Sequence, residues 1–193
     1  MPQPASNDPI DPDAIGGGSY KGVMRASTVI RWAIVGALAV ALALFYVLTA
    51  SAEELTGKVV RVADGDTITV LGPGNQQHKI RLMGIDAPEK AQPFGNKSRE
   101  SLASMVAGRN VVVEWRKRDR YGRLVGQVIA DSHDVGLVQI ARGMAWHYKT
   151  YEHEQRPADA QGYAHAEVQA KAVRRGLWAD PVPTPPWSWR RAK

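Results

Sequence analysis

The segment Trp32–Leu48 runs for seventeen residues without a charge, and it strongly limits what the chain can fold into. A helix that crosses a membrane needs about 20 apolar residues, with a lower limit near 17, whereas the apolar part of a signal peptide has about 7–15. A buried core helix is the alternative, but this segment is apolar on every face, which suits lipid better than a small domain. We therefore predict a transmembrane or signal helix within residues 29–50.

Charges flank this segment unevenly. Three cations precede it and two acids follow it: Lys21, Arg25 and Arg31, then Glu53 and Glu54. The positive-inside rule then places the N-terminus in the cytoplasm and the following domain outside it. Residues Ala50-Ser51-Ala52 match an A-x-A cleavage pattern. We expect either a membrane anchor through residues 32–48 with a periplasmic or extracellular domain, or secretion after cleavage near Ala52.

Composition divides the rest of the chain. Residues 1–28 are rich in Pro, Asp, Gly and Ser, so they bury too little apolar surface to offset chain entropy and are predicted to be disordered. Residues 55–179 are predicted to form the folded domain, and the Pro-, Trp- and Arg-rich residues 180–193 an extended or disordered tail. Residues 53–193 carry 22 Lys and Arg against 16 Asp and Glu, hence the whole net charge of +6. A basic domain suggests a polyanionic partner.

Short β-rich segments dominate the folded region. Five of them are predicted strands: Gly57–Val62, Asp66–Leu71, Gln77–Met83, Asn110–Arg118 and Arg123–Asp131. Three segments are predicted helices: Lys97–Ala107, Val135–Arg142, and one that Asp159 caps and that runs to Arg175. Five strands with a helix between the third and fourth follow the order of an OB-fold. The predicted fold class is α+β, a five-stranded barrel with about three helices, preceded by the transmembrane or signal helix.

Cysteine is absent from the chain, which excludes a disulfide scaffold, a thiolate zinc site, an iron–sulfur cluster and a cysteine nucleophile. The five histidines are scattered and none is paired at metal-ligand spacing. We expect His147, His153 and His165 on the surface of helices or loops.

Three short motifs carry charged residues in turns or loops. They are Asp64-Gly65-Asp66-Thr67, then Arg81 followed by Ile85-Asp86-Ala87-Pro88-Glu89, then Arg120-Tyr121-Gly122-Arg123. Each alone is compatible with a solvated turn or an exposed strand edge. Their order and spacing together, from Leu55 to Trp178, resemble the staphylococcal nuclease-like, or thermonuclease, family.

The resemblance implies an OB-barrel that cleaves DNA and RNA in a Ca²⁺-dependent reaction and leaves 3′-phosphates. It implies these roles: Asp66 and Asp86 as metal carboxylates, Ala87 as a backbone carbonyl ligand, Glu89 as general base for attack by water at the metal, Arg81 and Arg123 on the reacting phosphate, Arg120 and Tyr121 near a terminal phosphate, and Tyr148 near a base-stacking aromatic.

The residue types suit this chemistry on physical grounds. Hard carboxylate and carbonyl oxygens select Ca²⁺ or Mg²⁺, and a guanidinium can donate two hydrogen bonds to one phosphate. Five cations within Arg116–Arg123 indicate either a solvated hairpin or a stripe that tracks a nucleic-acid backbone. Two alternatives stay open: a non-catalytic OB-fold module that binds nucleic acid at the membrane, and an envelope interaction protein that merely carries the barrel. No obligate protein partner is evident.

Overall fold

The computed structural model describes residues 31–32, 34–37, 39–40 and 53–192. The predicted disordered segment 1–28, most of the predicted segment 29–50 and the cleavage pattern at residues 50–52 lie outside these residues. Residues 31–32, 34–37 and 39–40 are helical. Within the described ranges, no helix combines the length and the apolar character needed to cross a membrane. Residues 53–192 belong to one compact unit.

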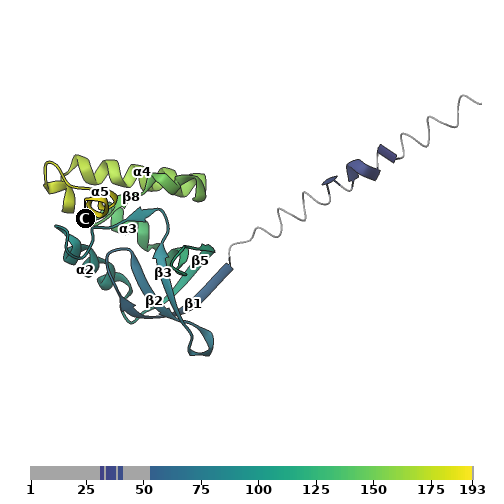
Figure 1. Cartoon of the computed structure of the whole chain (residues 1–193), viewed down its shortest axis with the longest axis horizontal. Coiled ribbons are helices and arrows are strands. Elements are labelled where there is room, and N and C mark those ends of the chain that lie inside the picture. Colours follow the sequence, from purple (N-terminus) through teal and green to yellow (C-terminus); the bar gives the residue numbers. More distant parts are fainter. Residues whose placement is uncertain (1–30, 33, 38, 41–52, 193) are drawn as a thin grey trace, which may run out of the picture. The chain divides into compact units, whose positions relative to one another are not determined.

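A closed barrel of five strands forms the centre of this unit (Figure 1). Its strands are β1 (Glu53–Val62), β2 (Thr67–Leu71), β3 (Gln77–Leu82), β5 (Asn110–Arg118) and β6 (Leu124–Ala130). Neighbouring strands pair antiparallel, except that β3 and β6 pair in parallel and close the barrel. Helix α2 (Gly95–Val106) connects the third and fourth barrel strands. The predicted OB-fold is therefore confirmed.

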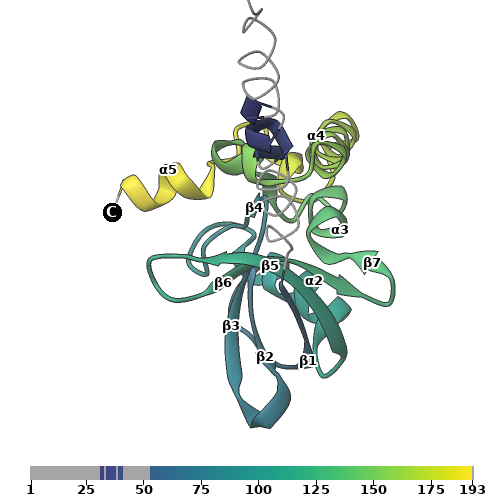
Figure 2. The ribbon, with the colours of Figure 1, turned by 90° about the vertical axis from the view of Figure 1, so that its right-hand side faces the viewer.

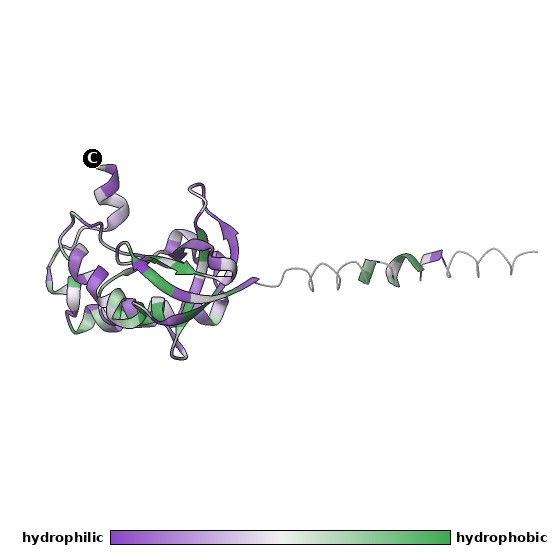
Figure 3. Cartoon of the chain, turned by 90° about the horizontal axis from the view of Figure 1, so that it is seen from below, coloured by the Kyte–Doolittle hydropathy of each residue, from purple (hydrophilic) through white to green (hydrophobic). Residues whose placement is uncertain are grey.

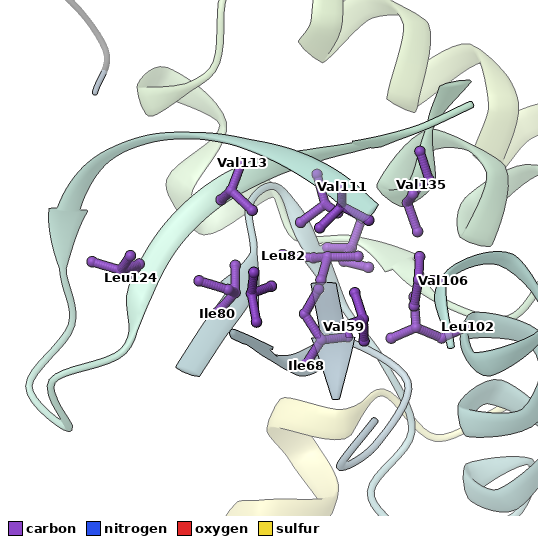
Figure 4. Close-up of a cluster of buried hydrophobic side chains, with 14 of the residues drawn as sticks. Val59, Ile68, Ile80, Leu82, Leu102, Val106, Val111, Val113, Leu124 and Val135 are labelled. Carbon is purple, nitrogen blue, oxygen red and sulfur yellow. The ribbon is translucent and has the colours of Figure 1, made fainter. Parts of the chain in front are cut away.

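Apolar side chains from every barrel strand meet inside it. Figure 4 shows Val59, Ile68, Ile80, Val113 and Leu124 pointing into one cluster, and each is at most 2% exposed. Leu102 and Val106 of α2 pack on the same cluster. The alternation of inward apolar and outward polar residues, such as Ile80 and Leu82 beside Arg81, holds the strand register.

The other predicted helices are present with shifted ends. Helix α3 (Val135–Ala141) is capped by Asp134, whose carboxylate accepts from the N–H groups of Gly136 and Leu137. Helix α4 (Pro157–Ala172) begins two residues before the predicted cap Asp159, because Pro157 supplies the fixed φ of a first helical residue. The remaining elements are short: η1 (Pro73–Asn75), β4 (Ile85–Asp86), β7 (His133–Asp134), β8 (Trp146–His147), η2 (Lys149–Glu154) and η3 (Gly176–Ala179).

The prediction of a disordered tail is wrong. Residues 186–191 form helix α5 (Pro186–Arg191), and Trp187 packs against the cluster around Trp146 and Trp178. Figure 2 shows α5 and α4 at the same end of the strands, and Figure 3 shows α5 as pale to polar in hydropathy. Proline content argued for an extended chain, but burial of an indole ring offsets the entropy of ordering a stiff segment.

Candidate active site

Two buried aspartates meet on one arginine. Asp66 precedes β2 and is 4% exposed, and Asp86 ends β4 and is fully buried. Arg81 on β3 lies between them, with Nη1 at 2.9 Å from Asp66 Oδ1 and Nη2 at 2.8 Å from Asp86 Oδ1. The pairing of Thr67 with Arg81 across β2 and β3 brings the first aspartate to this arginine. The structure thus assembles three of the predicted site residues.

Local hydrogen bonds hold Asp66 in one orientation. Its Oδ1 accepts from Thr67 Oγ1 at 2.8 Å and its Oδ2 accepts from the Ala87 N–H at 3.1 Å. Its own N–H donates to Asp64 Oδ1 at 3.0 Å. The turn needs Gly65, because a Cβ there would lie 1.9 Å from Ser98 Oγ. The predicted carbonyl role of Ala87 stays a prediction.

Burial and charge shift the pKa values of this group. Burial raises the pKa of Asp86, although hydrogen bonds from two arginines work against the rise. Burial and the charge of Asp66 raise the pKa of Asp64 to about 6. Burial disfavours the charged form of Arg81, but Asp66 and Asp86 outweigh it and raise its pKa above the usual value. Arg81 is therefore held as a cation by the carboxylates around it.

A fourth charged residue, Arg190 of α5, completes the cluster. Its Nη2 lies 2.8 Å from Asp86 Oδ2, and its Nη1 lies 3.1 Å from Asp86 Oδ1 and 2.8 Å from Glu89 Oε1. Hydrogen bonds to Asp86 are the main reason that the pKa of Arg190 is raised. Sequence reasoning missed this residue. The pair Arg190-Arg191 signalled a cation, but nothing in a linear pattern indicated which acid it would meet.

Glu89 lies in the loop after β4 and is more accessible than the aspartates. Its side chain is 39% exposed, and its N–H donates to Gln92 Oε1 at 3.1 Å. Its contact with Arg190 connects it to Asp86. The structure thus brings the predicted general base to the edge of the cluster.

Arg123 approaches the cluster from the β5–β6 hairpin. Its Nε lies 2.7 Å from Asp119 Oδ2, and its Nη1 lies 3.4 Å from Thr67 Oγ1. Arg120 stacks over the Tyr121 ring at 4.8 Å, and Tyr121 is 68% exposed. These contacts orient Arg123 and leave the hairpin tip in solvent.

A cavity of about 520 Å³ joins the hairpin to the cluster. It is lined by five predicted residues, Arg81, Arg120, Tyr121, Arg123 and Tyr148, and also by Lys117, Arg118, Tyr151 and Arg190. Asp66 and Asp86 adjoin the cavity through Arg81, which contacts both. The cavity is therefore lined mainly by cationic and aromatic side chains, together with the acids Asp119 and Glu154.

His147 differs from the expectation of a surface histidine. It is 2% exposed on β8, with Nε2 at 3.0 Å from Gln155 Oε1, whereas His153 and His165 are exposed as expected. Its N–H donates to Glu167 Oε1 at 3.1 Å. His147 therefore belongs to the packing of β8 under α4.

The donor set fits a hard divalent cation held by few protein ligands. In the part of the chain that the structure describes, no group of three or more His, Cys, Asp or Glu could hold a metal. Asp66 and Asp86 are two carboxylates that already gather cationic groups, since Arg190 binds both oxygens of Asp86. Two carboxylates completed by water suit a hard cation such as Ca²⁺ or Mg²⁺ better than a metal that prefers thiolate or imidazole.

Comparison with known proteins places this geometry in a family. Residues 79–180 match the family described as staphylococcal nuclease homologues. An uncharacterized endonuclease of Haemophilus influenzae is 43% identical over 151 residues, 78% of this chain and 82% of the relative. Protein ParB of Escherichia coli is 41% identical over 79% of this chain and 89% of the relative. A micrococcal nuclease of Shigella flexneri is 39% identical over 84% of this chain and 97% of the relative.

The match runs from within β3 to η3, and the micrococcal nuclease relative aligns over 84% of this chain. It agrees with the closed barrel and with the charged residues that the barrel brings together. The chain belongs to the family of staphylococcal nuclease homologues.

Proposed function

We propose that this protein hydrolyses phosphodiester bonds within DNA, RNA or both, with Ca²⁺ as cofactor and 3′-phosphate products. One observation carries the proposal: Arg81 is fixed between two buried aspartates and lines a basic cavity. A phosphodiester is an anion, so its hydrolysis needs positive charge at the phosphate and a group that takes a proton from water. The relatives named endonuclease and micrococcal nuclease support the same reaction class.

Arg81 and Arg123 would bind the phosphate and stabilise the charge that develops on it. Each guanidinium is already oriented by a carboxylate, Arg81 by Asp66 and Arg123 by Asp119. Two oriented guanidinium groups can each donate a pair of hydrogen bonds to equatorial phosphate oxygens. Removing such a donor commonly lowers a rate by about 10²–10³-fold.

Glu89 would accept the proton of the attacking water. Its side chain is accessible and adjoins the aspartates through Arg190. A positioned base contributes roughly 10²–10⁴-fold to a rate.

Asp66, Asp86 and the carbonyl of Ala87 would hold the Ca²⁺ ion. When bound, the ion would supply positive charge to the reacting phosphate. Asp66 is pre-oriented for this by Thr67 and by the Ala87 N–H.

The cavity wall would bind the rest of the substrate. Lys117, Arg118 and Arg120 carry positive charge along the β5–β6 hairpin, and Tyr121, Tyr148 and Tyr151 offer aromatic faces. Backbone contacts and stacking of this kind recognise single strands with little sequence preference.

A cleavage assay tests the proposal. Purified protein should degrade labelled DNA or RNA in Ca²⁺ and stop in excess EGTA, and Asp66→Ala should remove the activity without unfolding the barrel. Full activity in EGTA would contradict the Ca²⁺ assignment. Binding of DNA in Ca²⁺ without cleavage would make the non-catalytic binding module the better description.

We also propose that the catalytic domain lies outside the cytoplasm, anchored through residues 32–48 or released after cleavage near Ala52. The support is the row of cations before the apolar segment. A reporter that is active only in the cytoplasm, fused after Lys193, should give no signal. A strong signal would contradict both forms of this proposal.

A further inference from the structure

Helix α5 reaches the candidate site from the far end of the chain. Asp86 and Arg190 are 104 residues apart in sequence and are joined by hydrogen bonds. The segment between η3 and α5 contains Pro181, Pro183 and Pro185, which restrict its backbone. The tail is therefore a stiff arm that ends at the carboxylates.

Arg190 uses the oxygens that a metal would need. Its two terminal nitrogens contact both oxygens of Asp86, and one of them also contacts Glu89. Arg81 contacts the same Oδ1 of Asp86. A divalent ion on Asp86 would lie beside a guanidinium at hydrogen-bond distance, and like charges that close repel strongly.

Trp187 of the same helix covers one face of Tyr148, a residue that lines the cavity. Its ring stacks on Tyr148, with ring centroids 5.5 Å apart and an interplanar angle of 26°. A base could not stack on that face of Tyr148 while Trp187 occupies it. One short helix thus takes up a carboxylate position and a stacking position at once.

The arm is anchored independently of these two contacts. The side-chain amide of Gln92 donates to the carbonyl of Thr184, and its Oε1 accepts from the Glu89 N–H. Trp187 also lies edge-on to Trp146, with ring centroids 6.4 Å apart. Anchoring keeps Arg190 at high effective concentration near Asp86.

The Arg190 contact is suited to release. The side chain of Arg190 is 41% exposed, while Asp86 is fully buried. A buried carboxylate needs a paired cation, so a competing cation that takes the place of Arg190 meets the same need. A purely structural contact would not need to engage both Asp86, a predicted metal ligand, and Glu89, the predicted general base.

We propose that α5 is an intramolecular occupant of the site, and that Arg190 and a divalent cation bind Asp86 in competition. This inference rests on the proposed function, but its test measures Ca²⁺ binding and not cleavage. In the resting protein the arm contacts Asp86 and Glu89 and covers one face of Tyr148. A divalent cation at Asp86 displaces the arm and exposes the site to nucleic acid.

The test measures Ca²⁺ binding by calorimetry on the full-length chain without nucleic acid. Arg190→Gln should tighten Ca²⁺ binding about threefold to tenfold, because it removes the competing cation. Arg191→Gln is the matched control, since it removes the same charge from the adjacent exposed residue. Asp86→Asn added to Arg190→Gln should abolish the gain.

Hydrogen exchange provides a second measurement. Amides of residues 181–192 should exchange faster in saturating Ca²⁺, and faster in Arg190→Gln even without Ca²⁺. The proposal is overturned if Arg190→Gln binds Ca²⁺ no more tightly than Arg191→Gln, if no variant binds Ca²⁺, or if Ca²⁺ leaves tail exchange unchanged. Cleavage assays on the same proteins report the proposed function separately, so its failure is distinguishable.

Discussion

Asp134 and Asp86 are both carboxylates inside the same domain, but their partners differ in kind. Asp134 accepts from the N–H groups of Gly136 and Leu137, from Tyr163 Oη and from Gln127 Nε2. All four donors are neutral. Asp86 instead accepts from guanidinium nitrogens of Arg81 and Arg190.

The difference separates a structural carboxylate from one that is proposed to be functional. The neutral donors to Asp134 belong to the start of α3, to β6 and to α4, so losing them would disturb packing. The cationic donors to Asp86 neutralise a buried charge, and another cation can do the same. Four substitutions test this contrast.

Arg81→Lys should have the largest effect, on catalysis. Lysine keeps the charge, but its single ammonium group cannot bridge Asp66 and Asp86 and also donate two hydrogen bonds to one phosphate. We expect the single-turnover cleavage rate to fall about 10²–10³-fold. Circular dichroism should show a folded barrel, and a rate within threefold of wild type would place the phosphate elsewhere.

Glu89→Gln should have the next largest effect. The amide keeps the size of the side chain but cannot accept a proton, so the rate should fall roughly 10²-fold. Binding of uncleaved DNA in Ca²⁺ should persist. Glu100→Gln, an exposed acid on α2, is the control and should cleave normally. Normal cleavage by Glu89→Gln would leave the nuclease proposal intact and remove the general-base role.

Tyr163→Phe tests the structural side of the comparison. It removes the hydroxyl that donates to Asp134 at 2.8 Å, and a hydrogen bond to a charged group is worth about 1.5–3 kcal/mol. We expect the free energy of unfolding in urea to fall by about that amount. Cleavage at a temperature well below Tm should be unchanged. A large loss of rate would contradict the purely structural role of Asp134.

The same variant has a defined pH dependence. Burial, then the charge of Asp134, raises the pKa of Tyr163 above its ordinary value of 10.0. The folded protein then keeps this proton where the unfolded chain loses it, so the stabilisation is complete below pH 10.0 and declines above it. The difference in unfolding free energy between wild type and Tyr163→Phe should shrink as pH rises past that value.

Arg120→Gln should have the smallest effect, on binding. Arg120 lines the cavity at the exposed hairpin tip, so it would contact a phosphate without reaching the reacting one. We expect weaker binding of a single-stranded oligonucleotide and a salt slope smaller by about 0.7. Lys79→Gln, an exposed residue of β3 that does not line this cavity, should leave the slope unchanged.

Local sequence patterns determined the barrel strands and placed charged residues directly beside them. The alternation around Ile80 and Arg81 predicted β3 with its inward and outward faces, and the motif from Ile85 to Glu89 placed acids directly after it. The hydrophobic pattern of residues 135–142 predicted α3. These predictions succeeded because each depends on residues within a few positions of one another.

Tertiary structure alone decided which distant residues meet. Arg190 reaches Asp86 because Trp187 is buried against Trp146 and Tyr148, and no local pattern carries that packing. His147 is buried because β8 pairs with β4 beneath α4, although its neighbours in sequence resemble a loop. In the sequence, a charged or polar side chain indicates only which kinds of group it can bind. Its actual partner depends on the path of a chain whose contacts lie up to 104 residues apart.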